Sequence, residues 1–511
     1  MFEGPRCLLL HEEDNVAVAL TGGSAGEKVA VGERLFTLAD DVPSGHKIAV
    51  KDILAGAAVI KFGQLIGVAT SNILQGQHVH VQNLTVGDEP HVLAVVASTA
   101  VVSPTEDRQA LARTFMGYRR PNGKVGTRNY LAILSSVNCS ATACRQIEKQ
   151  IQPEISGFAN VDGVVALVHQ SGCGMNADGD GWKIFCRTLS GYANHPNFAG
   201  VLVVGLGCEV AQISSLLREI EPRGEGLLQH ITIQDAGGTR QAVEAGLVAL
   251  REMLHLANGN EREIVPAEHL VVGLQCGGSD GYSGISANPV LGKAVDLIVQ
   301  AGGTAILSET PEIHGAEALL TGRAASRDVA TKLLDRMEWW KEYTARNNSD
   351  MDNNPSPGNK AGGITTILEK SLGAVAKAGS TPLMGVFLYA ELISQKGLVF
   401  MDSPGYDPVS ATGQVASGAN LICFTTGRGS TYGCKPSPCI KIATNSPLFR
   451  RMSEDMDFNA GVVLDGDMNI DEASEDLFEL ILDVASGRKS ASEENDLGDN
   501  EFVPWHIGAV L

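Results

Sequence analysis

The sequence predicts an α/β protein in which a small β-rich N-terminal domain precedes a large α/β region with mainly parallel sheets. Two patterns along the chain carry this prediction. Residues 7–90 hold short alternating runs, such as NVAVAL and KIAV, separated by polar turns, which is typical of small β domains. From Gly117 onward, continuous apolar runs such as FAGVLVVGLG alternate with segments of helical length. This alternation indicates βαβ units whose strands are buried on both faces.

The chain has 511 residues, too many for one hydrophobic core, and we divide it into four parts. Residues 1–95 form the β-rich domain, and residues 96–116 form a linker. Residues 117–375 form an α/β domain with expected strands in YLAILSSVN, VDGVVALVHQ, HITIQ and HLVVGLQ. Residues 376–511 form a C-terminal α/β domain with expected strands in STPLMGVFL, GLVFMD, ANLICFTT and PCIKIATN. The last 25 residues are acidic, and we expect them to form a surface tail.

The formal net charge is −20, which argues against nucleic acid or an anionic membrane as a partner. The first residues, MFEGPRCLLLHEEDN, do not resemble a signal peptide. No window approaches the roughly 18 apolar residues of a membrane span. Ten cysteines in a chain of this length do not form a disulfide scaffold. We therefore expect a cytoplasmic protein whose cysteines are thiols or metal ligands.

Four cysteines follow apolar runs that read as buried strands: Cys139, Cys173, Cys208 and Cys276. Because the carboxyl ends of parallel strands meet at one edge of a sheet, these thiols are expected to be neighbours in space. Thiolates select iron, zinc or iron–sulfur clusters. The alternative is that each is a small buried hydrophobe, as free cysteines often are. No CxxC pair is present to support a standard cluster. Packing is the expected role of the other six cysteines.

Ionisable residues accompany two of these cysteines. His169 stands four residues before Cys173, and Glu209 directly follows Cys208. An imidazole at a strand end can ligate a metal, act as a general base, or be a satisfied core residue. Glu309 and Glu312, in SETPE, form a further carboxylate pair at an expected strand end.

The motif HVHVQN places two histidines in the β-rich domain. His78 and His80 alternate along an expected strand and therefore point to the same face. Two imidazoles on one face can chelate a metal or grip a carboxylate, although an exposed strand face also explains them. His46 and Lys47, together with Lys61, add a small basic group to this acidic protein.

Two loops, CGGSDGYSGISANP (276–289) and NPSPGNKAGG (354–363), are rich in Gly, Ser and Asn. Such loops offer backbone N–H groups to an anionic or polyhydroxylated ligand, and neither matches a phosphate-binding or dinucleotide fingerprint. Arg428, in TTGRGS, is suited to clamp a carboxylate. The residues thus predict an α/β enzyme with a thiol-, His- and carboxylate-bearing cleft for an oxygen-rich, anionic small molecule.

The stretches GYRRPNGKVGTRN, VHQSGCG, GLGCE, QCGGSDGYSGISANP, NPSPGNKAGGITT, EKSLG, TTGRGS and IKIATN occur in order along the chain. With HVHVQN, they resemble the altronate dehydratase/galactarate dehydratase family. The resemblance implies a SAF-like β domain at the N-terminus and a large α/β catalytic region after it. It implies removal of water from a small-molecule sugar acid with Fe²⁺ or another divalent metal such as Mn²⁺, and it leaves a labile iron–sulfur cluster open.

The expected chemistry assigns roles to residues. The α-proton of a hydroxy acid is weakly acidic, so a metal that binds the carboxylate and a hydroxyl would stabilise the enediolate that forms. On this basis we expect the metal at Cys139, Cys173, Cys208 and Cys276. The acid or base candidates are His169, Lys360 and Glu209. The expected substrate contacts are His46, His78, His80, Ser279, Asp280, Asn359 and Arg428.

Several alternatives stay open from the sequence. The same scaffold could cleave a C–S bond in another hydroxy acid such as sulfolactate, or it could be a non-catalytic protein that binds a metal or a sugar acid. The identity of the sugar acid is open as well. We expect a homo-oligomer, a dimer, with no nucleic-acid or membrane partner.

Overall fold

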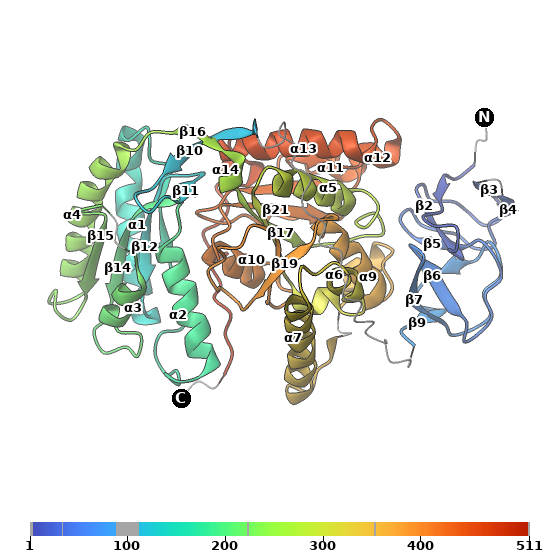
Figure 1. The fold of residues 1–511 in the computed structure, drawn as a ribbon, viewed down its shortest axis with the longest axis horizontal. Helices are drawn as coiled ribbons and strands as arrows, with labels where there is room; N and C mark the ends of the chain where they lie inside the picture. Colours follow the sequence, from blue (N-terminus) through green and yellow to red (C-terminus); the bar gives the residue numbers. More distant parts are fainter. Residues whose placement is uncertain (1–3, 33, 88–111, 222–223, 352–353, 509–511) are drawn as a thin grey trace.

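The structure, a computed structural model, describes residues 4–32, 34–87, 112–221, 224–351 and 354–508. Most of the predicted linker 96–116 lies outside these ranges. The described chain forms three bodies: an N-terminal β domain, a second domain and a C-terminal domain. Figure 1 shows the N-terminal and second domains on opposite sides of the C-terminal domain. The predicted α/β class with a small β-rich N-terminal domain is confirmed.

The N-terminal domain consists of short strands in three small sheets, ordered β1-β2-β5-β8, β3-β4 and β6-β7-β9, and every pair is antiparallel. Its strands are β1 (Cys7–Leu8), β2 (Val16–Ala19), β3 (Lys28–Val31), β4 (Arg34–Thr37), β5 (Lys47–Ala49), β6 (Ala58–Lys61), β7 (Gln64–Ala69), β8 (His78–Val79) and β9 (Leu84–Thr85). Alternating apolar residues fill its two small cores. The alternation that predicted a β domain therefore has its usual cause, one buried face per strand.

The second domain is a three-layer α/β unit with a parallel sheet in the order β13-β12-β14-β15. Its strands are β12 (Tyr130–Ser135), β13 (Gly163–Leu167), β14 (Phe198–Gly205) and β15 (Leu228–Thr232), and its helices are α1 (Ala141–Ile151), α2 (Asp180–Ala193), α3 (Ile213–Glu219) and α4 (Thr239–Asn258). Leu131 and Ile133 share a core with α1 and α4, whereas Ala132 and Leu134 share a core with α2. Both faces of the sheet are covered, which explains the unbroken apolar runs.

The C-terminal domain is built on a seven-stranded parallel sheet ordered β19-β20-β18-β17-β21-β22-β23. Its strands are β17 (Val271–Cys276), β18 (Thr304–Leu307), β19 (Leu383–Phe387), β20 (Gly397–Met401), β21 (Leu421–Thr426), β22 (Cys439–Ala443) and β23 (Phe458–Asn459). The division predicted at 375/376 falls inside this sheet, because β17 and β18 precede it and the other five strands follow. The chain instead passes from one large sheet to the other between β15 and β17.

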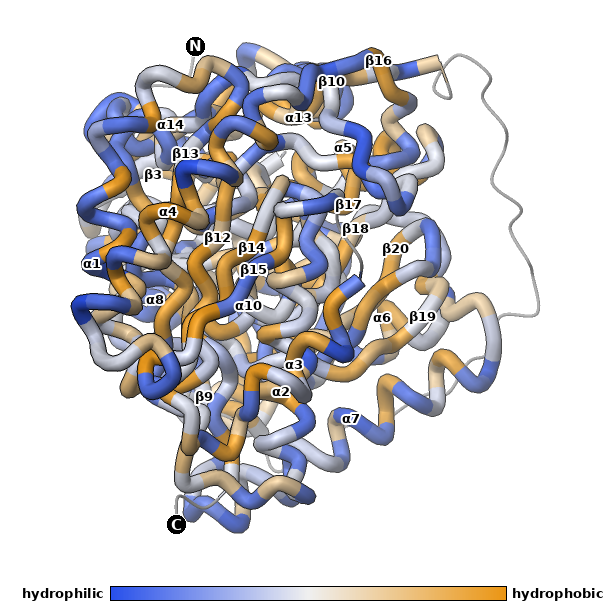
Figure 2. Tube along the Cα trace, turned by 90° about the vertical axis from the view of Figure 1, so that its left-hand side faces the viewer, coloured by the Kyte–Doolittle hydropathy of each residue, from blue (hydrophilic) through white to orange (hydrophobic). Residues whose placement is uncertain are grey.

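Helices cover this second sheet: α5 (Ala287–Gln300), α6 (Ala318–Thr321), α7 (Arg327–Arg346), α8 (Pro357–Ala361), α9 (Ile367–Val375), α10 (Asp407–Ala416), α11 (Ser446–Arg451), α12 (Val462–Asp465), α13 (Ile470–Ala485) and α14 (Ala491–Glu494). Figure 2 shows β12 and β20 as hydrophobic segments, and it shows hydrophobic and hydrophilic positions alternating along α7. Within the described ranges, no helix is long and apolar enough to cross a membrane.

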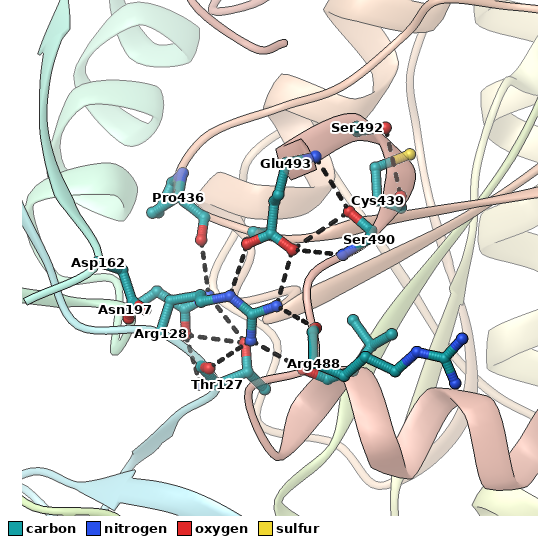
Figure 3. A network of polar contacts seen from close by, with 12 residues as sticks. Thr127, Arg128, Asp162, Asn197, Pro436, Cys439, Arg488, Ser490, Ser492 and Glu493 are labelled. Carbon is teal, nitrogen blue, oxygen red and sulfur yellow. Dashed lines mark hydrogen bonds and ion pairs between the residues drawn. The ribbon is translucent and has the colours of Figure 1, made fainter. Parts of the chain in front are cut away.

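A small sheet joins β10 (Thr114–Arg119) and β11 (Val125–Gly126), which precede the second-domain sheet in the chain, to β16 (Glu263–Pro266), which follows it. Beside it, the buried guanidinium of Arg128 donates to both carboxylate oxygens of Glu493, at 2.6 and 2.8 Å (Figure 3). The same guanidinium donates to the carbonyl oxygens of Val484 and Arg488. One side chain thus ties the start of the second domain to the end of the C-terminal domain.

The acidic C-terminal segment does not behave as a surface tail. Phe502 and Trp505 are each 9% exposed and belong to the main core. The Trp505 ring stacks on that of Trp340 in α7, with ring centroids 5.4 Å apart. The prediction of a tail was wrong because it relied on net charge, whereas a few aromatic side chains determine where the segment lies.

Candidate active site

The junction between the N-terminal and C-terminal domains brings several loops into contact. Thr366 donates a hydrogen bond to the carbonyl oxygen of Ile66 at 2.6 Å, and the Lys47 ammonium donates to the carbonyl oxygen of Gly363 at 2.7 Å. Gly281 comes so close to Gly45 that a Cβ atom on it would collide with the Gly45 carbonyl oxygen. A glycine is required there because backbone approaches backbone across the domain boundary.

A buried ion trio forms the floor of this junction. Glu369, on α9, accepts from Lys47 at 2.8 Å and from Lys61 at 2.8 Å, and all three side chains are at most 3% exposed. Burial alone would raise the pKa of Glu369, but the two ammonium groups outweigh it and hold that pKa well below its usual range. Burial lowers the pKa of Lys47 to about 8, against the opposing attraction of Glu369. Two ammonium groups and one carboxylate give the trio a net positive charge, which favours an anionic ligand beside it.

Three histidines of the N-terminal domain converge beside this trio. His46 Nδ1 lies 3.0 Å from His78 Nε2, and the His80 ring centroid lies 4.7 Å from that of His46 and 5.4 Å from that of His78. Burial lowers the pKa of all three, to about 4 for His78 and His80, so the rings are neutral at pH 7. The prediction that His78 and His80 share a face is confirmed.

The histidine set fits a metal ion. One ring nitrogen of each lies within 4.8 Å of the others, and His80 Nδ1 is buried with no hydrogen-bond partner. His46 Nε2 lies 3.3 Å from the carbonyl oxygen of Ala361, and a neutral ring that donates there presents its Nδ1 lone pair toward His78 Nε2, 3.0 Å away. Metal-bound histidines characteristically donate their other ring N–H to a carbonyl or carboxylate. Neutral imidazole is also the ligating form.

Loops of the C-terminal domain supply the other polar groups at this junction. Asn359 donates to the carbonyl oxygen of Ser279 at 2.9 Å, and Arg428 donates through Nη1 to the carbonyl oxygen of Gly358 at 3.0 Å. Asp280 is buried and accepts from Thr444 at 3.0 Å. Lys360 is exposed next to Ala361, whose carbonyl contacts His46. The seven predicted substrate contacts, and Lys360 with them, thus lie on strand, helix and loop segments that meet at one place.

A second buried cluster lies behind these loops, at the carboxyl ends of β17 and β18. The Cys276 sulfur lies 3.4 Å from Oε2 of Glu312, and the other carboxylate oxygen, Oε1, accepts from Lys370 at 2.7 Å. Glu309 has a positive φ of 70°, pairs with Lys377 at 3.2 Å, and leaves Oε1 without a partner. A small pocket is lined by Cys276 and Lys370 together with Lys61 and Glu369. The cluster therefore opens toward the ion trio.

Glu369, Lys370 and Lys377 were not predicted as site residues. Glu369 and Lys370 stand side by side in ILEKSLGAV, an otherwise apolar helix that is buried along most of its length. Two adjacent charges in such a helix are a signal in themselves, because buried charges need partners or a function.

The remaining predicted residues lie in the second domain, away from this junction (Figure 1). His169 accepts from the Ser171 N–H at Nδ1 and donates from Nε2 to the Ser135 carbonyl oxygen, so both ring nitrogens are occupied. Glu209 accepts from the Ser136 hydroxyl and from two backbone N–H groups of its own loop. Both side chains hold loops together.

The four predicted metal-ligating cysteines do not share one sheet edge. Cys139, Cys173 and Cys208 follow β12, β13 and β14 of the second domain, whereas Cys276 ends β17 of the other sheet. Cys276 is buried, and the other three are exposed. Sequence pattern locates the ends of strands, but it does not assign strands to sheets.

Three family models match the chain in consecutive ranges: the altronate/galactarate dehydratase SAF domain over residues 5–87, the second domain of D-galactarate dehydratase/altronate hydrolase over 117–258, and the C-terminal domain of D-galactarate/altronate dehydratase over 267–510. The chain belongs to the altronate/galactarate dehydratase family. The N-terminal β domain is accordingly its SAF domain, and the chain is an enzyme of the hydro-lyase class.

Individual relatives agree with the family models. The chain is 36% identical to altronate dehydratase of Bacillus subtilis, over 98% of this chain and 99% of that protein. It is 38% identical to galactarate dehydratase (L-threo-forming) of Escherichia coli, over 94% and 92%. It is 34% identical to the beta subunit of (2R)-sulfolactate sulfo-lyase of Chromohalobacter salexigens, over 76% of this chain and 97% of that subunit.

Proposed function

We propose that this enzyme removes water from a sugar acid of the altronate or galactarate type, giving a 2-keto-3-deoxy sugar acid, at the junction of the SAF and C-terminal domains. The observation that carries this location is the convergence of three neutral histidines on the Lys47–Glu369–Lys61 trio. The relatives named altronate and galactarate dehydratase support the reaction and its substrate class.

The charge at the junction suits such a substrate. The protein carries a net charge of −20, yet the buried trio holds two lysines against one glutamate, and the adjoining segments add the exposed Lys360 and Arg428 and the buried Asp280. Arg428 uses Nη1 to fix Gly358 and keeps further N–H groups for a carboxylate. We assign it the binding of the carboxylate of the sugar acid.

Proton transfer at the α-carbon needs a group on the exposed side of the junction. We assign it to Lys360, since His169 and Glu209 lie in the second domain with their polar atoms already engaged. The hydrogen bond from the Asn359 side chain to the Ser279 carbonyl oxygen positions α8, the short helix that carries Lys360. A divalent metal such as Fe²⁺ or Mn²⁺ would be held by His46, His78 and His80, and it would supply stabilisation of negative charge on the substrate oxygens.

A second candidate reaction is C–S cleavage of a sulfonated hydroxy acid. The match to a sulfolactate sulfo-lyase subunit over nearly its whole length favours it. Both reactions begin with removal of the proton beside the carboxylate and differ in the group that leaves. A non-catalytic binding protein would instead bind a sugar acid and leave it unchanged.

The test is an anaerobic assay of the purified enzyme with Fe²⁺ or Mn²⁺ against a panel of aldonates, aldarates and sulfolactate. We expect a 2-keto acid, detected as its semicarbazone, from altronate or galactarate. His78→Ala should abolish the product, whereas His230→Ala, an exposed histidine of the second domain, should not. Sulfite release from sulfolactate without keto acid from any sugar acid would favour the second candidate. Absence of both products would contradict the assignment of the junction as a catalytic site.

A further inference from the structure

The three exposed thiols of the second domain form a set that the junction does not use. The chain has ten cysteines, and the three that are exposed are Cys139, Cys173 and Cys208. Cysteine is among the residues most often buried, so three exposed thiols on one domain need an explanation. They follow β12, β13 and β14, which are adjacent in the order β13-β12-β14.

Hydrogen bonds join the loops that carry these thiols. The Asn138 N–H, next to Cys139, donates to the Ser171 carbonyl oxygen at 2.9 Å. The carbonyl oxygen of Gly172, next to Cys173, accepts from the Ala211 N–H at 3.2 Å. The three loops are therefore one connected frame at the carboxyl edge of the sheet.

Two further contacts fix this frame. The Ser136 hydroxyl donates to Glu209, the residue after Cys208, at 2.8 Å. Gly172 has a φ of 97°, and a Cβ atom on it would collide with the Ser136 carbonyl oxygen. The buried groups His169 and Glu209, which the dehydration does not use, thus serve to hold the three cysteine loops together.

The distance between the sulfur atoms distinguishes a site for a single metal ion from a site for an iron–sulfur cluster. Thiolates on one metal ion sit about 2.3 Å from it, so their sulfurs lie within about 4.6 Å of one another. Among the described residues, the sets of three ligand atoms that lie within 4.8 Å of each other are His46–His78–His80 and Cys276–Glu309–Glu312. The three exposed thiols are not such a set. An iron–sulfur cluster, whose cysteines bind separate iron atoms, accommodates a wider spacing.

We propose that Cys139, Cys173 and Cys208 bind a [4Fe–4S] cluster on the second domain, with one iron left without a protein thiolate. Three iron atoms take the three thiolates, and exposure of all three side chains leaves the fourth iron accessible to a small oxygen ligand. The site is distinct from the junction, which lies across the C-terminal domain (Figure 1). It also differs from the four-cysteine set expected from the sequence, because Cys276 belongs to the other sheet.

The test uses the full chain, purified without oxygen and reconstituted with ferrous iron and sulfide. We expect about four acid-labile sulfide atoms per chain and about five iron atoms, four in the cluster and one at the histidine site, with broad visible absorbance and an electron paramagnetic resonance signal after reduction. Cys139→Ser, Cys173→Ser and Cys208→Ser should each lose the absorbance and the sulfide. Cys186→Ser, a half-buried cysteine on α2 of the same domain, should keep both.

A second measurement does not depend on the folding of the variants. In the reconstituted wild-type protein, alkylation followed by mass spectrometry should show these three thiols protected, and removal of iron by a chelator should expose them. His78→Ala should retain the cluster, so failure of the junction site and failure of this site are distinguishable. Iron without labile sulfide, zinc in place of iron, or equal alkylation before and after chelation would each overturn the proposal.

Discussion

Lys47 of the SAF domain lies 2.8 Å from Glu369 of the C-terminal domain, and the two side chains are 0% and 2% exposed. A buried pair of this kind contributes little net stability when intact, but it is costly to break, because the partner left behind keeps its charge without water. Lys61 shares the same carboxylate, at 2.8 Å. Because the trio has two cations and one anion, its three substitutions should lower the stability of the folded protein by different amounts.

We expect Glu369→Gln to destabilise the protein more than Lys47→Met or Lys61→Met. It removes the carboxylate that the two buried ammonium groups share, whereas each lysine variant leaves Glu369 with one ammonium partner. Breaking a buried pair costs about 3–5 kcal/mol. Thermal unfolding and limited proteolysis of the SAF domain measure the effect, with Lys51→Met, an exposed lysine of that domain, as control. Equal melting temperatures for Glu369→Gln and Lys51→Met would show that the trio does not stabilise the junction.

His80→Ala should weaken binding of Mn²⁺ to the purified protein. His80 Nδ1 is buried without a partner and belongs to the histidine set that fits a metal. Loss of a direct ligand should exceed the roughly 10- to 100-fold effect of losing an outer-shell partner. Equilibrium dialysis or calorimetry provides the affinity, and His230→Ala is the matched control. Unchanged affinity of His80→Ala for Mn²⁺ would contradict the assignment of a metal site to these histidines.

Arg428→Ala should raise KM for the sugar acid with little change in kcat. A hydrogen bond to a charged group contributes about 1.5–3 kcal/mol, which corresponds to roughly a 10- to 150-fold rise in KM. Arg428→Lys should recover part of the affinity, because an ammonium keeps the charge but not the planar pair of donors. Arg346→Ala, on the exposed end of α7, should be neutral. A fall in kcat at constant KM would instead place Arg428 in the chemical step.

Asp407→Asn should change how stability depends on pH. Burial, and then the charge of Glu312, raise the pKa of Asp407 from 3.8 to about 7. Between these values the folded protein holds a proton that the unfolded chain releases, so Asp407 lowers the free energy of unfolding as pH rises through this window. Asparagine lacks this dependence.

The stability of Asp407→Asn relative to wild type should therefore increase from pH 4 to pH 7 and then level off. Melting temperatures at pH 5 and pH 8 for both proteins measure it. Asp476→Asn, an exposed aspartate on α13, should show a difference from wild type that stays constant between the two pH values. The same constant difference for Asp407→Asn would show that this carboxyl titrates normally.

The sequence predicted local features well and long-range ones less well. Strict alternation predicted that His78 and His80 lie on the same side of the chain, although β8 ends at Val79, and unbroken apolar runs predicted the buried strands β12, β14 and β17. These features depend on neighbours within one element. The loops with Ser279, Asn359 and Arg428 were recognisable because glycine-rich, polar turns after apolar strands are suited to ligands.

The sequence pattern did not predict which strands belong to the same sheet. Cys276 follows an apolar run much like those before Cys139 and Cys208, yet it belongs to another sheet with another set of neighbours. For the same reason, the division predicted at 375/376 cut through a single sheet. Glu369 and Lys370 were missed because their partners, Lys61 and Glu312, come from distant parts of the chain.

The Arg128–Glu493 pair has a consequence for the order in which the protein is made. The two residues are separated by 365 positions, so the ribosome synthesises most of the chain before the guanidinium can meet its carboxylate. Domains tend to fold as they emerge, N-terminal ones first. Until the end of the chain is made, the second domain holds an arginine whose hydrogen-bonded carboxylate partner is missing, and the carboxylate of its own that acts on this arginine is the charge of Asp162. A nascent chain stalled before residue 493 should expose this arginine and be a better chaperone client than one released a few dozen residues later.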